Sequence, residues 1–196
     1  MRTKTLLAVA ALTFCLCLAP ATFAQNLVTN GSFETGDFTG WTTGGNFEDS
    51  SVTFGGFYDY TGAQDGTWYA VLGPVGSDGT LSQTLTTVAG AQYTVSFWLA
   101  SVGDDPSDFS AYWNSTQLLS LSDPNTGSNW TQYTFTALGT GSDTLSFSFR
   151  DDPAYIGLDN VSVTQNAPTA PEPSSFLLLG TGVLGLGGIV RRKLGR

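Results

Sequence analysis

Residues 93–99 read Tyr-Thr-Val-Ser-Phe-Trp-Leu, and this stretch decides the fold. Its first, third, fifth and seventh residues are apolar, and the positions between them hold Thr, Ser and Trp. This period-two pattern is typical of a β-strand that buries one face. Trp98 has the opposite parity to the buried set, so its ring is expected on the other, partly solvated face.

The same alternation recurs along the chain, and turn-forming runs of Gly, Pro, Asn and Asp separate the segments. Helical periodicity is nearly absent between residues 25 and 165. Eight to ten short strands without crossover helices predict an all-β fold, an antiparallel jelly-roll β-sandwich. Besides 93–99, the expected strands are 67–72, 81–85, 109–113, 117–121, 130–137, 145–149 and 155–164.

The last expected strand changes phase in its middle. Ile156 and Leu158 share one parity, whereas Val161 and Val163 have the other. Both pairs reach the same core only if an extra residue is inserted between them, so we expect a β-bulge near Asp159.

Charge and reactive side chains exclude several function classes. Residues 25–166 hold fifteen acidic residues and one basic residue, Arg150, which gives this segment a net charge of −14. Such a surface repels phosphate backbones, so no nucleic-acid partner is expected. Both cysteines, Cys15 and Cys17, precede this segment, and the chain has no His. Catalytic triads, His-ligated zinc and thiolate metal sites are therefore excluded from it.

Both ends of the chain have the composition of processing signals. Residues 1–24 form a signal peptide: a basic start, an apolar run over 6–18 and small residues ending at Ala24. The folded domain is expected over 25–165, followed by a Pro-containing linker over 166–175. Residues 176–190 are apolar and predict a short transmembrane helix, and residues 191–196 form a basic tail that should stay cytoplasmic.

The C-terminal pattern resembles the PEP-CTERM sorting signal of Gram-negative bacteria. That resemblance implies a protein that is exported, held transiently in the inner membrane by this helix alone, and then released toward the cell surface. Its processing partners would be signal peptidase and exosortase. The residues that carry the signal are Pro171, Glu172, Pro173, Arg191, Arg192 and Lys193.

The middle segment resembles the jelly-roll carbohydrate-binding modules related to families 4, 9 and 22, which are galactose-binding-like. The opening Asn-Gly-Ser-Phe-Glu at 30–34 and the closing Leu-Asp-Asn-Val at 158–161 carry the resemblance. It implies a structural Ca²⁺ that links the first and last strands through Glu34 and Asp159. Carboxylate and carbonyl oxygens are the ligands that Ca²⁺ takes. The alternative is that Glu34 binds backbone amides and Asp159 caps the bulge.

Sugar rings present apolar C–H faces and a hydroxyl rim, so their sites combine aromatic platforms with a few amides or carboxylates. Three groups of residues have this composition, although ordinary hydrophobic packing or an edge-covering loop would also explain them. The acidic surface favours a neutral glycan. The candidates are Trp98, Tyr58, Tyr60, Asp59, Tyr112 and Asn114.

We do not expect the protein to be an enzyme. The acidic pairs at 48–49 and 151–152 are adjacent residues, which point to opposite faces of a strand and so do not form a facing catalytic pair. The sequence predicts a cell-surface or extracellular-matrix protein with a non-catalytic carbohydrate-binding module. The alternative is a purely structural protein of the exopolysaccharide or biofilm matrix, without a discrete sugar site.

Overall fold

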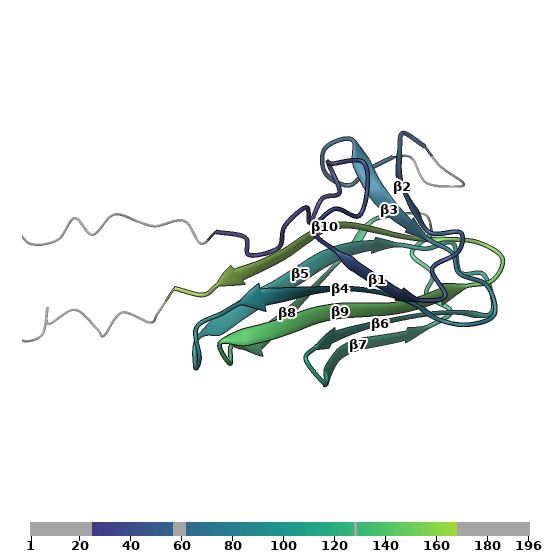
Figure 1. The fold of residues 1–196 in the computed structure, drawn as a ribbon. Coiled ribbons are helices and arrows are strands. Elements are labelled where there is room, and N and C mark those ends of the chain that lie inside the picture. The colour runs from purple at the N-terminus through teal and green to yellow at the C-terminus, as the bar shows by residue number, and fades with distance from the viewer. Residues whose placement is uncertain (1–24, 57–61, 128, 168–196) are drawn as a thin grey trace, which may run out of the picture.

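The computed structural model describes residues 25–56, 62–127 and 129–167, and these form two antiparallel sheets packed face to face (Figure 1). The predicted all-β sandwich is confirmed, and no helix occurs among the described residues. The strands are β1 (Thr42–Gly45), β2 (Ser51–Phe54), β3 (Trp68–Leu72), β4 (Gly79–Thr86), β5 (Gln92–Ala100), β6 (Ser107–Trp113), β7 (Thr116–Ser122), β8 (Thr131–Leu138), β9 (Ser142–Asp151) and β10 (Ile156–Gln165).

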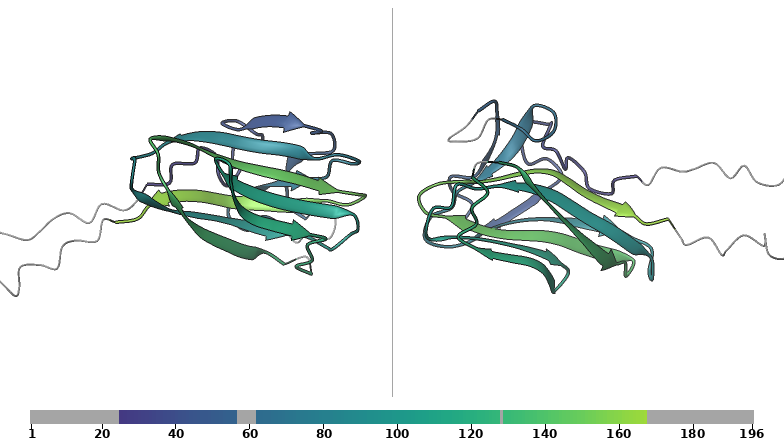
Figure 2. Two further views of the ribbon diagram at one scale, coloured as in Figure 1. Left: turned by 90° about the horizontal axis from the view of Figure 1, so that it is seen from below. Right: turned by 180° about the vertical axis from the view of Figure 1, so that it is seen from behind.

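Each sheet has five strands. One has the order β1-β4-β9-β6-β7 and is called the β9 sheet after its central strand; the other has the order β2-β3-β10-β5-β8 and is called the β10 sheet. Asn26 forms a β-bridge with Thr164, so the start of the described chain runs beside the end of β10 (Figure 2). The N-terminal and C-terminal ends of the domain therefore lie together.

The core lies between the two sheets and is rich in aromatic rings. The ring of Phe97 on β5 meets that of Phe147 on β9 edge to face, with centroids 5.1 Å apart, and Phe109 on β6 lies 5.6 Å from Phe147. All three side chains are fully buried. Burial of such large apolar surfaces supplies most of the driving force for folding, and edge-to-face geometry adds to it.

The predicted bulge is present in β10. The pairing of β10 with β5 shifts register between Asp159 and Ser162, and Asn160 adopts a φ of 47°. Ile156, Leu158, Val161 and Val163 are consequently all buried in one core. The bulge leaves Asp159 on the outer side of the β10 sheet.

The two edge strands β1 and β2 were not among the expected strands. Gly44 and Gly45, residues typical of turns, form the end of β1. A Cβ on Gly45 would lie 2.5 Å from the carbonyl oxygen of Asp78, and the φ of Gly45 is 65°. Glycine is required there because β1 approaches the β4 backbone closely.

Some predicted features lie outside the described residues. These are the signal peptide, the apolar segment 176–190 with its basic tail, the sorting-signal residues, and Tyr58, Asp59 and Tyr60. Over the ranges that the structure does describe, no helix has the length and apolar character needed to cross a membrane.

Candidate functional site

Trp98 lies on the outer face of the β10 sheet, as its parity predicted. It pairs with Asp159 of β10 on one side and with Gln132 of β8 on the other. Its side chain is half-buried, and within the described part of the chain it makes neither a hydrogen bond nor a ring contact. Its indole ring is thus partly exposed on that face.

The Asp159 side chain is fully buried beside Trp98 and binds backbone amides. Oδ2 accepts hydrogen bonds from the N–H groups of Gln64 (2.8 Å) and Asp65 (3.0 Å), and Oδ1 accepts one from Asn160 (2.7 Å). Burial raises the pKa of Asp159 to about 6, although these amides act in the opposite direction. Asp159 therefore fastens residues 64–65 over the outer face of the sheet.

Glu34 fastens the next part of the same segment. Its Oε1 accepts hydrogen bonds from the N–H groups of Thr67 (2.7 Å) and Trp68 (2.8 Å). A Cβ on Gly66 would lie 2.3 Å from this oxygen, so the carboxylate fits only over a glycine. The structure thus brings the two predicted calcium ligands to one segment, 64–68.

The predicted metal ligands include no third carboxylate. Among the described residues, no three His, Cys, Asp or Glu side chains lie close enough together to hold a metal ion. Any cation in this domain would therefore need backbone carbonyl oxygens or water to complete its coordination, as Ca²⁺ commonly does.

A small aromatic cluster covers the outer face of the β10 sheet next to Trp98. The rings of Tyr69 and Trp130 meet edge to face at 5.6 Å, and Trp130 Nε1 donates a hydrogen bond to the carbonyl oxygen of Gly62 at 3.0 Å. Tyr69 packs with Val71 and Ala100. Trp98 lies two residues before Ala100 on β5, so it stands at the border of this covered area.

Hydroxyl side chains line the opposite outer face, that of the β9 sheet. Alternation along its strands turns the apolar residues to the core and the small polar residues outward. This face is polar and largely uncharged. Its hydroxyl residues on β4, β6 and β9 are Thr80, Ser82, Thr84, Thr86, Ser110, Thr144, Ser146 and Ser148.

Tyr112 on β6 and Asn114 in the turn between β6 and β7 belong to the side of the β9 sheet and so lie away from Trp98. The Tyr112 ring is half-buried on the outer face, and its hydroxyl accepts a hydrogen bond from Gln117 Nε2 at 3.3 Å. Asn114 uses its whole amide within the fold: Nδ2 donates to Asp143 Oδ1 at 2.7 Å, and Oδ1 accepts from Thr144 N at 2.8 Å. The predicted sugar-binding residues are therefore divided between opposite faces.

Sequence reasoning missed two buried acids at the ends of β9. Asp143 and Asp151 are both fully buried. Desolvation raises the pKa of Asp143, but hydrogen bonds from Thr87, Thr140 and Asn114 outweigh it and lower the pKa to about 2. Burial raises the pKa of Asp151 to about 7, and Asp104 adds to the increase. Extending the alternation of 145–149 by one step at each end would have placed both acids on the core face.

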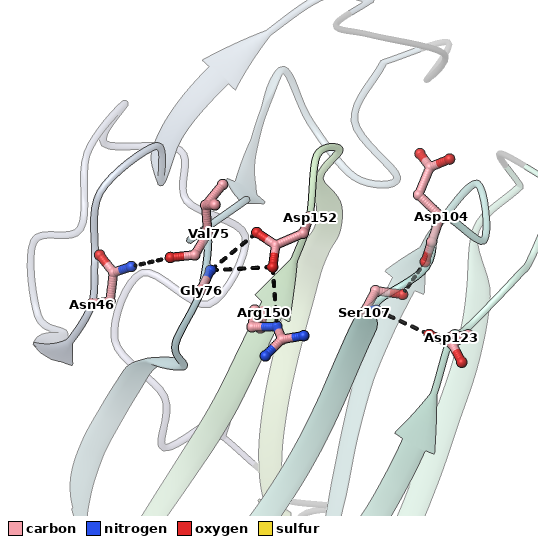
Figure 3. Close-up of polar contacts among 8 residues, drawn as sticks. All are labelled: Asn46, Val75, Gly76, Asp104, Ser107, Asp123, Arg150 and Asp152. Atoms are coloured by element: carbon pink, nitrogen blue, oxygen red, sulfur yellow. Dashed lines mark hydrogen bonds and ion pairs between the residues drawn. The ribbon is translucent and has the colours of Figure 1, made fainter.

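Arg150 forms an ion pair with only one of its acidic neighbours. Its Nε lies 3.4 Å from Asp152 Oδ2, and Asp152 also accepts hydrogen bonds from the Gly76 N–H at 3.1 Å (Figure 3). Asp151 points to the other side of the strand, away from this pair. Arg150 and Asp152 can pair because residues two apart on a strand share a face, whereas the adjacent Asp151 faces the opposite way.

The two five-stranded sheets form a sandwich of the kind found in carbohydrate-binding modules. TmCBM61, solved in complex with β-1,4-galactotriose, superposes with a TM-score of 0.60 and 18% identity over 73% of this chain and 100% of that chain. The CBM22-1 xylan-binding domain of Paenibacillus barcinonensis Xyn10C superposes with a TM-score of 0.54 and 18% identity, over 76% of this chain and 100% of that chain. Identities this low establish a shared fold and leave the ligand open.

An enzyme also contains this fold. The enzymatically active domain of bacteriophage CBA120 tailspike protein 4 gives a TM-score of 0.52 and 17% identity, over 72% of this chain and 21% of that chain. The other two similar structures are carbohydrate-binding modules, and a non-catalytic domain fits this similarity. No curated protein matches the chain.

The C-terminal segment is identified by its own sequence model. Residues 169–193 match the PEP-CTERM protein-sorting motif, which confirms that resemblance. The motif implies processing by exosortase and export to the surface or the surroundings of a Gram-negative bacterium.

Proposed function

We propose that the protein is a non-catalytic glycan-binding module, exported with its signal peptide, held briefly by residues 176–190 and then released to the cell surface or matrix. The observation that carries this proposal is Trp98. A half-buried indole without any ring or hydrogen-bond partner in the described structure is a platform for the apolar face of a sugar. Neighbouring Gln132 and the Thr and Ser residues of the sheet supply polar groups.

A glycan array tests the proposed binding. The full chain, purified in a detergent without a sugar headgroup, is expected to give saturable binding to one family of neutral glycans. Anionic glycans should bind poorly because the domain carries a net charge of −14. A folded protein that binds no glycan on the array would instead support a structural matrix role, in which Trp98 only packs.

Calcium at Glu34 and Asp159 is a second part of the proposal. Glu34 Oε2 has no hydrogen-bond partner among the described residues, and both carboxylates are already fixed on segment 64–68. Together with backbone carbonyls, these oxygens fit the donor set that Ca²⁺ prefers. The bound ion would stabilise the attachment of the first loop and last strand to this segment.

We expect Ca²⁺ to raise the melting temperature of the protein, and Glu34→Gln to reduce that increase. Stabilisation by a ligand follows mass action, about 2.7 kcal/mol at a hundredfold excess over Kd. Differential scanning fluorimetry with Ca²⁺ and with chelator measures the shift. Equal shifts in Glu34→Gln and in the wild type would remove Glu34 from the site.

A further inference from the structure

Asp151 is a buried carboxylate with little compensation. Its side chain is fully buried, and neither Oδ1 nor Oδ2 accepts a hydrogen bond of ordinary length and angle in the described structure, although the backbone N–H of Ala154 acts to lower its pKa. It lies on the core side of β9, in line with Phe147 and Phe149. Burying a carboxylate without compensation is costly, so proteins pair such groups or bind them to metals.

The opposite end of β9 shows what compensation by protein groups looks like. Asp143 has the same parity and the same complete burial. Its carboxylate accepts hydrogen bonds from Thr87 Oγ1, Asn114 Nδ2 (2.7 Å), and the backbone N–H and hydroxyl of Thr140 (both 2.8 Å). Hydrogen bonds thus satisfy the acid at one end of the strand, whereas the acid at the other end has no comparable set of donors.

Further acidic residues gather around Asp151 through Ser107, its paired residue on β6. The Ser107 hydroxyl donates to the carbonyl oxygen of Asp104 at 2.7 Å, and its N–H donates to Asp123 Oδ1 at 3.0 Å (Figure 3). Asp152, the next residue in the chain, is a further acid close to Asp151. The one cation here, Arg150, binds Asp152 on the outer side of the strand. The surroundings of Asp151 are therefore strongly negative.

Two carbonyl oxygens accept hydrogen bonds from the backbone N–H groups of Asp151 and Asp152. The carbonyl oxygen of Pro74 lies 3.3 Å from the Asp151 nitrogen, and that of Pro106 lies 3.1 Å from the Asp152 nitrogen. Each carbonyl oxygen has a second lone pair besides the one used in its hydrogen bond. A bidentate carboxylate, backbone carbonyls and water make a ligand set that Ca²⁺ accepts and that the more demanding octahedral Mg²⁺ does not favour.

We propose that Asp151 is a ligand of a second calcium site, separate from Glu34 and Asp159, where the loops before β4 and β6 meet the end of β9. The ion would replace the hydrogen bonds that this carboxylate lacks and would offset the charges of Asp104, Asp123 and Asp152. With no triad of clustered metal-binding side chains in the described ranges, carbonyl oxygens and water would complete the coordination.

Counting bound ions tests this site directly. Equilibrium dialysis with radioactive Ca²⁺ on the full chain in detergent is expected to show one ion fewer per chain in Asp151→Asn than in the wild type. Asp108→Asn is the matched control, because Asp108 lies on β6 opposite Arg150 and on the outer face. The Asp108→Asn variant loses the same single negative charge, and it should bind as many Ca²⁺ ions as the wild type. Glu34→Gln should also keep the ion that depends on Asp151.

Equal numbers of bound ions in Asp151→Asn and in the wild type would overturn the proposal, as would a wild type that binds no Ca²⁺. Melting curves confirm that each variant is folded. If Asp151→Asn does not fold, Asp151→Val removes the buried oxygens with a side chain suited to a strand interior, and the same loss of one ion is expected. None of these results depends on whether the domain binds a glycan.

Discussion

Replacing Asp143 by alanine is expected to destabilise the domain by about 3 kcal/mol or more. The substitution removes the acceptor of the buried Thr87 hydroxyl, and also that of the Asn114 amide and the Thr140 N–H, which lie nearer to solvent. A buried donor left unsatisfied costs roughly 1–3 kcal/mol, and hydrogen bonds to a charged group contribute roughly 1.5–3 kcal/mol. For a domain of this size, about 3 kcal/mol corresponds to a melting temperature lower by about 10 °C.

The effect of Asp143→Ala should depend on pH in a defined direction. The pKa of this carboxyl is about 2 in the folded protein and 3.8 ordinarily. Its contribution to stability is therefore complete above pH 3.8 and is lost as the pH falls through about 2. The difference in melting temperature between wild type and Asp143→Ala should be largest above about pH 4 and shrink toward pH 2.

Ser142→Ala is the control for this prediction. Ser142 is the exposed neighbour of Asp143 on β9, and its side chain faces away from the donors. Its melting temperature should match that of the wild type at every pH. If Asp143→Ala also melts within about 2 °C of the wild type, the donors have found water and the network does not hold this end of the sandwich.

Most strand positions were predictable because, in a sandwich, buried and outward-facing residues alternate along each strand. Each strand in the two sheets turns one face to the other sheet, so apolar residues recur at every second position in β4, β5, β6 and β9. The phase change in β10 predicted its bulge for the same reason. The edge strands β1 and β2 were missed, because both have only four residues and because the glycines of β1 look in sequence like those of a turn.

Grouping of the candidate site residues was not predictable. Trp98 and Tyr112 both have outward parity, but they belong to different sheets and so face opposite sides of the molecule. The structural use of Asn114 depends on Asp143, which is distant in sequence. The alternation along a strand tells which side chains point away from the core. The order of strands in the sheets decides which of these side chains lie close together.

The buried acids show a different limit of sequence reasoning. An aspartate at a strand end usually lies in solvent, so residue type alone does not predict the burial of Asp143 and Asp151. Asp143 and Asp151 are buried because loops close over both ends of β9. The parity of β9 contained that information, and the donors at one end and their absence at the other appear only in the structure.

Trp98→Ala is expected to abolish glycan binding while leaving the fold intact. Aromatic residues at the centre of binding surfaces commonly contribute 2 kcal/mol or more, so affinity should fall by about thirtyfold or more. Trp98 is half-buried on an outer face of the sheet, so Trp98→Ala should still fold but melt at a somewhat lower temperature than the wild type. Isothermal titration calorimetry with the best glycan from the array measures the affinity.

Tyr112→Ala is the matched control, since it removes a half-buried ring from the opposite outer face. Loss of binding in Trp98→Ala with normal binding in Tyr112→Ala would place the sugar on the β10 sheet, beside Asp159 and segment 64–68. The reverse result would move the site to the hydroxyl-lined face of the β9 sheet, where Tyr112 would be the platform. Either result assigns a face, because the two rings share no strand, no sheet and no hydrogen-bond partner in the described structure.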